Sequence, residues 1–225
     1  MPASPRRSYR IRLIAAVLAI GLLAIGAAPT RAATAYGRDV YFSAGYERQI
    51  DNRTCIAGST GMMMNFLARR DMNLSQTWML HYAQQRDALS DATQRGSDPL
   101  GWSRAATYFS GWTGRPTTYK WEAYASATSA LRRAAKQIAI TGKPVGLLVS
   151  HGAHAMVMTG FTATANPAST STWTLSTIWV SDPYGYPHRS VPATKSPLNS
   201  YLQTDATSYY DQQWYGRYIV IVPQG

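Results

Sequence analysis

Cysteine is almost missing from this chain, because its 225 residues contain only one, Cys55. An internal disulfide is therefore excluded, and the fold must rest on its hydrophobic core. The sequence also lacks a Walker loop, a dinucleotide-binding fingerprint, a zinc motif and an internal repeat. We therefore expect neither a cofactor nor a bound metal.

Acidic residues are scarce as well: 11 Asp and Glu stand against 22 Lys and Arg, which gives a formal net charge of +11. Several of these arginines precede the only long apolar run, residues 13–28. A basic head, an apolar run and small residues are typical of a secretory signal peptide. Ala33-Thr34-Ala35 fits the cleavage site, so we predict removal of residues 1–35, with a cut after Ala32 as the alternative. The run is shorter than the roughly 18–20 residues of a membrane anchor.

Without residues 1–35 the net charge falls from +11 to +6, because five arginines and no acid are removed. The remaining basic residues are scattered rather than interleaved with aromatic residues, so nucleic acid is not expected as a partner. Residues 36–225 have the length of one domain with a full core. We expect a secreted monomer without stable membrane insertion, outside the cell or in the cell envelope. Its positive charge leaves binding to an anionic cell wall open.

The single cysteine stands where a polar loop turns into an apolar segment. In a secreted protein an unpaired cysteine indicates either an intermolecular bridge or a working thiol, and a small buried side chain is the further alternative. Asn52 and Thr54 are residue types that cap helices, so we predict a helix that starts at Cys55. The positive end of that helix favours the thiolate form. Gln49, six residues upstream, can donate a hydrogen bond from its amide.

A second stretch whose side chains could take part in catalysis contains two histidines. From His154 the sequence alternates, which predicts a strand with His154, Met156 and Met158 on one face. A strand is a rigid place from which to aim an imidazole. His151, in the preceding turn, could reach the same area, and a buried structural histidine is the alternative to a catalytic one.

Asp182 follows the next predicted strand, residues 173–180. A carboxylate there could accept a hydrogen bond from a histidine Nδ1–H and fix the tautomer of the ring. An ordinary turn opened by Asp182-Pro183 is the alternative.

The remaining patterns indicate helices first and strands later, which is an α+β order. Residues 36–54 are expected to be extended and loop-like, and residues 185–216 are expected to be irregular. The aromatic residues in and next to the second segment could form a wall near a substrate, or they could pack this long loop onto the core. The predicted helices cover residues 55–70, 73–88, 99–110 and 126–141, and the other predicted strands cover residues 117–121, 145–149, 154–161 and 217–222.

The order of these motifs resembles the papain-like cysteine peptidase superfamily. It is most similar to the branch of bacteriocin-processing, double-glycine-leader peptidases and their stand-alone secreted relatives. In that branch the cysteine helix carries small residues and a Met, the histidine is followed by small and aliphatic residues and then Gly-aromatic, and an Asp-Pro follows a strand. The corresponding residues here are Ala57, Ser59 and Met63, then His154 to Phe161, then Asp182-Pro183.

The resemblance, over about residues 45–185, implies a papain-like α+β fold in which the cysteine helix packs on an antiparallel sheet that carries the His and the Asp. It also implies roles: Cys55 as nucleophile, His154 as base and then acid, Asp182 as the group that orients His154, and Gln49 as an oxyanion-hole donor beside the Cys55 N–H. The chain departs from the pattern at Ile56 and at the residue before the cysteine, where the family often has Asp or Asn.

The expected function is therefore that of a secreted thiol protease, which hydrolyses peptide bonds of a protein or peptide substrate through a thioester on Cys55. A cell-wall peptide hydrolase or an acyltransferase with the same triad is one alternative. A non-catalytic papain-like binding module is another, and a surface protein that dimerises through Cys55 is a third.

Overall fold

The computed structural model of the protein describes residues 35–88, 96–196 and 212–225. The chain divides into two units, Met1–Ala33 and Thr34–Gly225, and the fold below is that of the second. The predicted signal peptide lies outside the described residues apart from Ala35. Among the described helices, none has the length and apolar character that crossing a membrane requires.

The second unit is built on a seven-stranded sheet in which the described strand pairs are all antiparallel. Its main path runs in the order β2-β7-β3-β4-β5-β6, and the first strand, β1, pairs with β4. The strands are β1 (Tyr36–Asp39), β2 (Tyr119–Tyr124), β3 (Val145–Val149), β4 (His154–Ala163), β5 (Leu175–Asp182), β6 (Tyr186–Pro192) and β7 (Tyr218–Pro223).

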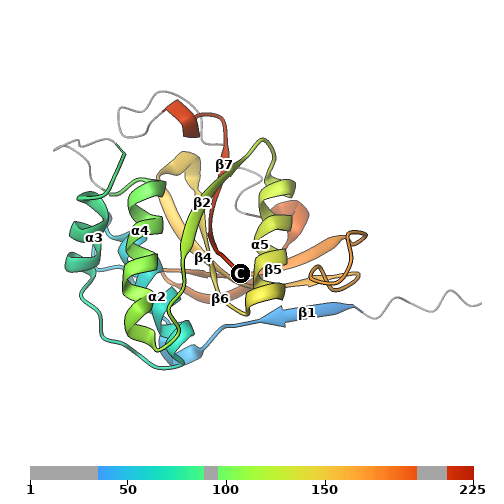
Figure 1. The fold of residues 1–225 in the computed structure, drawn as a ribbon, viewed down its shortest axis with the longest axis horizontal. Coiled ribbons are helices and arrows are strands. Elements are labelled where there is room, and N and C mark those ends of the chain that lie inside the picture. Colours follow the sequence, from blue (N-terminus) through green and yellow to red (C-terminus); the bar gives the residue numbers. More distant parts are fainter. Residues whose placement is uncertain (1–34, 89–95, 197–211) are drawn as a thin grey trace, which may run out of the picture. The chain divides into compact units, whose positions relative to one another are not determined.

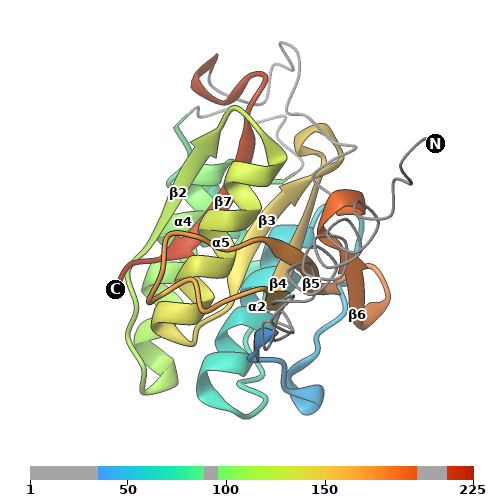
Figure 2. The same cartoon turned by 90° about the vertical axis from the view of Figure 1, so that its right-hand side faces the viewer.

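Helices cover both faces of this sheet (Figures 1 and 2). α2, α3 and α4 lie on one face and α5 lies on the other. The four helices are α2 (Cys55–Ala68), α3 (Gln76–Gln84), α4 (Pro99–Ser110) and α5 (Ala127–Thr141). The described unit is thus a mixed α+β fold with an antiparallel sheet, which confirms the predicted class at this level.

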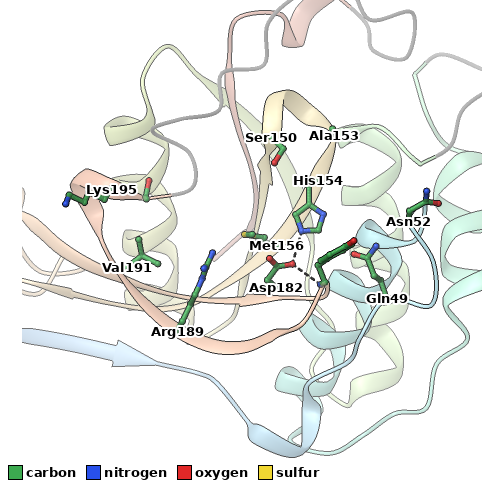
Figure 3. Close-up of a pocket in the computed structure, with 12 residues that line it drawn as sticks. Gln49, Asn52, Ser150, Ala153, His154, Met156, Asp182, Arg189, Val191 and Lys195 are labelled. Atoms are coloured by element: carbon green, nitrogen blue, oxygen red, sulfur yellow. Dashed lines mark hydrogen bonds and ion pairs between the residues drawn. The ribbon is translucent and has the colours of Figure 1, made fainter.

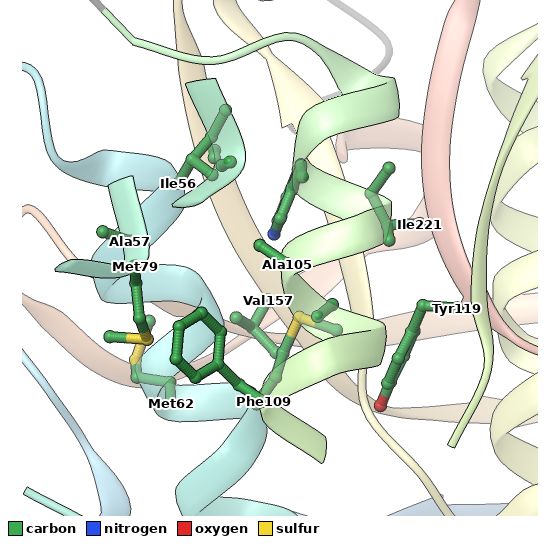
Figure 4. Packing of buried hydrophobic residues seen from close by; sticks show 14 of the residues in the cluster. Ile56, Ala57, Met62, Met79, Ala105, Phe109, Tyr119, Val157 and Ile221 are labelled. Atoms are coloured by element: carbon green, nitrogen blue, oxygen red, sulfur yellow. The ribbon is translucent and has the colours of Figure 1, made fainter. Parts of the chain in front are cut away.

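Each face of the sheet has its own apolar core. On β4, Ala155 and Val157 belong to the cluster under α2 and α4, whereas Met156 and Met158 belong to the cluster under α5. This division follows from the two-residue period of a strand. Figure 4 shows the first cluster, in which Met62 of α2, Phe109 of α4 and Val157 of β4 meet. The core therefore fixes α2 against the strand that begins with His154.

Capping side chains precede α3, α4 and α5, but only α4 and α5 have the predicted limits, since α3 is shorter at both ends than the predicted residues 73–88. Asp98 accepts a hydrogen bond from the Gly101 N–H at 2.8 Å, and α4 begins directly after it. Ser126 caps α5 in the same way, and Gly142 ends this helix with a φ of 64°. Both helices have the predicted limits to within one residue.

Residues 36–54, expected to be extended and loop-like, and residues 185–216, expected to be irregular, each contain a strand. β1 lies within residues 36–54, and β6 forms a hairpin with β5 within residues 185–216. Both strands lack the apolar alternation of a buried strand, because most of their residues are exposed. Of the two alternatives for the aromatic residues, packing onto the core holds for Trp214, which is fully buried against Trp121 with ring centroids 5.6 Å apart. Residues 197–211, with three of its tyrosines, lie outside the described residues.

Candidate active site

Cys55 is the first residue of α2, where the sequence placed it, and 8% of its surface is exposed. The predicted capping is wrong, because no described side chain caps this helix. The Thr54 hydroxyl turns back to Asp51, accepting its N–H and donating to its carbonyl oxygen at 3.1 Å each. Thr54 has φ −99° and ψ 18°, outside the extended conformation that capping needs. The Cys55 N–H is thereby left without a capping side chain, as an oxyanion site requires.

Small residues of α2 fix the distance between Cys55 and the other elements. The Ser59 hydroxyl, one turn after Cys55, donates to the carbonyl oxygen of Ala155 at 3.1 Å. At Gly58 an added Cβ would lie 3.1 Å from the Cβ of Pro183 and 3.4 Å from the Cα of Gln49. A side chain here would therefore push both neighbouring segments away from the helix. The sequence reading noted these small residues only as a family feature and missed their positioning role.

His154 begins β4, as predicted, directly after a turn in an unusual conformation. Ser150, His151 and Gly152 have consecutive positive φ values of 54°, 56° and 87°. Only Gly adopts this region readily, so the turn is strained at Ser150 and His151. The turn brings the His154 Nε2 within 2.8 Å of the Asp182 Oδ1. His151 is exposed and does not belong to the cavity that His154 lines.

The histidine ring presents the opposite nitrogen from the one expected. The sequence reading gave the Asp182 contact to Nδ1, but Nε2 makes it. Nδ1 is therefore the nitrogen left for Cys55, which lies close enough to His154 to raise the pKa of the ring. The ring extends from the first residue of β4, between the start of α2 and the end of β5, so its far nitrogen reaches the carboxylate.

The electrostatics favour a protonated His154. Burial lowers the pKa of this ring, but hydrogen bonds from its ring nitrogens to Asp182 and Cys55, together with the negative charges of these groups, raise it to about 9. Burial raises the pKa of Asp182, yet the hydrogen bonds that its carboxylate accepts from His154 and from the Tyr184 N–H hold it below its usual value. The site thus stabilises the imidazolium form of His154 next to the Asp182 carboxylate.

The Asp182 segment is held by the loop that precedes α2. The Tyr46 hydroxyl donates to the Asp182 carbonyl oxygen at 3.0 Å. The Gln49 N–H donates to the Pro183 carbonyl oxygen at 2.9 Å. These two bonds bring Gln49 to the same end of the sheet as the His154–Asp182 pair.

The Gln49 amide keeps one N–H available. Its Nε2 donates to the Asp51 carbonyl oxygen at 2.7 Å, which uses one of two hydrogens. Its Oε1 is buried and has no hydrogen-bond partner among the described residues. The side chain lines the site cavity, so the second N–H can serve a group bound there.

Gln76 of α3 clamps the loop on both sides of Gln49. Its Nε2 donates to the Arg48 carbonyl oxygen at 2.7 Å, and its Oε1 accepts the Ile50 N–H at 3.1 Å. The same Nε2 also donates to the Glu47 Oε1 at 2.8 Å. Gln76 is 6% exposed, so these bonds are shielded from water. No local sequence pattern indicates this clamp, because its partners are more than 25 residues away along the chain.

A cavity of about 610 Å³ opens beside these groups and is here called the site cavity. Figure 3 shows Gln49 and Asn52 on one side of the His154–Asp182 pair, and Arg189, Val191 and Lys195 on the other. His154 and Asp182 both line the cavity, whereas Cys55 is not among the lining residues. The full lining is Gln49, Asn52, Ser150, Ala153, His154, Met156, Asp182, Tyr184, Arg189, Val191, Lys195 and Ser196.

Within residues 35–88, 96–196 and 212–225, no three His, Cys, Asp or Glu side chains are grouped so that they could hold a metal ion. No protein-family model matches the chain, and no curated protein is significantly similar to it. The functional argument therefore rests on the geometry of the site.

Proposed function

We propose that this protein is a secreted, papain-like cysteine peptidase, which hydrolyses peptide bonds through a thioester on Cys55. The observation that carries the proposal is the position of His154, whose Nε2 is 2.8 Å from the Asp182 Oδ1 and whose pKa is raised to about 9 by Asp182 and the nearby Cys55. Export is supported by the signal-peptide layout of residues 1–35.

In the first half of the reaction, the Cys55 thiolate attacks the carbonyl carbon of the substrate, and a C–S bond forms. The negative charge that develops on the carbonyl oxygen is stabilised by the Cys55 N–H and the free N–H of Gln49. His154 then gives its Nδ1 proton to the amine nitrogen as the C–N bond breaks. The amine leaves, and the acyl group stays on Cys55 as a thioester.

In the second half, His154 is neutral and acts as a base. Its Nδ1 takes a proton from a water molecule that attacks the thioester carbon. The C–S bond breaks, the carboxylic acid product leaves, and the thiolate and the imidazolium are restored. Asp182 keeps its hydrogen bond to Nε2 throughout, which fixes the direction in which Nδ1 points.

The test is labelling with an epoxide cysteine-peptidase probe, followed by mapping of the label with mass spectrometry. We expect the label on Cys55, at a rate well above that of a free thiol at neutral pH. In parallel, the parent chain and its Cys55→Ala variant are assayed on a broad peptide library, where only the parent should produce new amines. Labelling no faster than a free thiol would point to a binding module, and equal cleavage by both chains would end the proposal.

A further inference from the structure

One side of the site cavity carries two positively charged side chains that form no ion pair with the described residues. Arg189 of β6 and Lys195, the last residue of the 3-10 helix η4 (Ala193–Lys195), both line it. Asp182 is the only acid among the lining residues, and its carboxylate is bonded to His154. Neither cation has a carboxylate within 4.0 Å among the described residues. The Arg189 guanidinium lies over the Tyr186 ring, 4.9 Å from its centroid.

Next to Lys195 the wall holds a hydroxyl that also lacks a partner. Ser196 is 1% exposed, it lines the site cavity, and its Oγ has no hydrogen bond among the described residues. Burying a polar group without a partner costs free energy, so such groups in native proteins indicate a missing ligand, water or ion. A hydroxyl donor beside a Lys and an Arg has the chemistry that binds a carboxylate.

The same wall also has an apolar part. Met156 and Val191 line it together with the two cations. Figure 3 shows Val191 between Lys195 and Arg189, with Met156 nearer to His154. A ligand with an aliphatic stem and a carboxylate therefore matches the mixed apolar and cationic character of this wall.

We propose that Arg189, Lys195 and Ser196 form a subsite for a carboxylate of the substrate, so that the enzyme selects peptides with an acidic group beside the cleaved bond. The proposal rests on the proposed function, because it uses the same cavity. The carboxylate can belong to a Glu or Asp side chain or to the end of a peptide, and the chemistry of the subsite is the same for both.

Arg189 has one further effect, since its positive charge also helps to hold the pKa of Asp182 below its usual value. Arg189 and Asp182 form no ion pair within 4.0 Å among the described residues, so the guanidinium donors remain available to a ligand.

The experiment measures binding separately from cleavage, with the full chain carrying Cys55→Ala. The probes are three fluorescent hexapeptide libraries of matched composition. One contains Glu and ends in an amide, one contains Gln and ends in an amide, and one contains Gln and ends in a free carboxylate. Dissociation constants are determined by fluorescence anisotropy at low and high salt. The variants Arg189→Gln and Lys195→Gln, singly and together, are compared with Lys136→Gln, which removes an exposed charge from α5.

We expect a carboxylate library to bind about five- to tenfold more tightly than the Gln-amide library at low salt, because two cations and a hydroxyl contribute. Tighter binding of the Glu library would assign the subsite to a side chain, and tighter binding of the free acid would assign it to a chain end. The double variant should lose the preference, whereas Lys136→Gln should keep it. The preference should also weaken from about 50 mM to about 500 mM salt, as screening increases.

Equal binding of the three libraries, or a preference that survives in the double variant, would overturn the subsite. The proposed function fails in a different way: the parent chain would then leave all three libraries uncleaved while the carboxylate preference in binding persisted.

Discussion

Two His–Asp pairs with the same hydrogen-bond geometry lie in different surroundings. His154 Nε2 is 2.8 Å from the Asp182 Oδ1, and His188 Nε2 is 2.8 Å from the Asp39 Oδ2. The side chains of the first pair are 18% and 7% exposed, and those of the second are 25% and 31% exposed. The hydrogen-bond distance alone therefore does not distinguish a candidate catalytic pair from a structural one.

Their neighbours separate them. The His188 ring is stacked between Tyr41 and Trp179, with centroid distances of 4.0 and 4.9 Å and interplanar angles of 8° and 17°. Both faces of this ring are covered, and its bond to Asp39 ties the start of the unit to β6. His154 instead contacts Cys55 and lines the site cavity. A histidine that is hydrogen-bonded to a carboxylate is thus a candidate catalytic residue only where a nucleophile and a cavity for the substrate lie next to it.

The largest expected effect on activity comes from replacing the histidine of each pair, one at a time, by asparagine. His154→Asn should lower kcat/KM by about 10⁴-fold or more, because the acid and base of both steps is lost. His188→Asn should leave kcat/KM within about threefold, but it should cost about 1 kcal/mol of unfolding free energy by removing the stacked ring. Steady-state kinetics and thermal unfolding of both variants give the comparison. Similar kinetic losses in the two variants would contradict the assignment of the first pair as the catalytic one.

Gln49 belongs to the surroundings of the first pair and should produce the next largest effect. Gln49→Ala should lower kcat by about 10²–10³-fold, which is typical for the loss of one oxyanion-hole donor. Gln85→Ala, an exposed glutamine of the α3 C-cap, is the matched control and should keep the parent rate. A Gln49→Ala chain with an unchanged kcat would remove this residue from the mechanism and leave the Cys55 N–H as the remaining donor.

Replacing the aspartate of each pair by asparagine tests a smaller difference in activity between the two pairs. Asp182→Asn should lower kcat/KM by about 10–10²-fold through loss of ring orientation and charge, and Asp39→Asn should have little kinetic effect. The parent should also lose activity as the pH rises through about 9, because the imidazolium of His154 is deprotonated there. This alkaline limb should move toward neutral pH in Asp182→Asn and stay in place in Asp39→Asn.

The same pKa shift predicts how stability depends on pH. The pKa of His154 is raised from 6.5 to about 9 in the folded protein, despite the opposing effect of burial. The resulting stabilisation is complete below about pH 6.5 and is lost as the pH rises to about 9. Thermal unfolding between these limits should show the loss in the parent and a smaller one in Asp182→Asn. An equal dependence in both chains would contradict the shift that is attributed to this pair.

The two pairs also differ in how well their positions could be predicted from the sequence. Cys55, His154 and Asp182 lie on the predicted elements, because the change from a polar loop to an apolar segment and the alternation of strands are local signals. The predicted caps of the Cys55 helix were not needed for this result. The second pair was not foreseen, since β1 and β6 are short, largely exposed strands without a period of apolar residues. The nitrogen that faces Asp182 depends on how α2, β4 and β5 meet, and no local pattern encodes it.

Replacement of Gln76 should have the smallest effect on kcat. It tests whether the residues that position Gln49 contribute to the site around His154 and Asp182. Because it holds the chain on both sides of Gln49, Gln76→Ala should lower kcat by about threefold to tenfold with little change in KM, through misplacement of the Gln49 donor. Gln84→Ala is the matched control, since this glutamine lies on the same helix and its amide holds the Gly96 carbonyl oxygen instead. Both variants should unfold at similar temperatures.

A double variant distinguishes positioning by Gln76 from a general weakening of α3. If Gln76 acts through Gln49, then adding Gln76→Ala to Gln49→Ala should cause almost no further loss of kcat, because the donor that it positions is already gone. Independent roles would instead multiply the two losses, and that result would refute the clamp as part of the site. Glu47, which shares the Gln76 amide, supplies a further readout. Burial raises its pKa to about 7 although the Gln76 hydrogen bond opposes this, so loss of Gln76 should raise that pKa further and make kcat more sensitive to pH near neutrality.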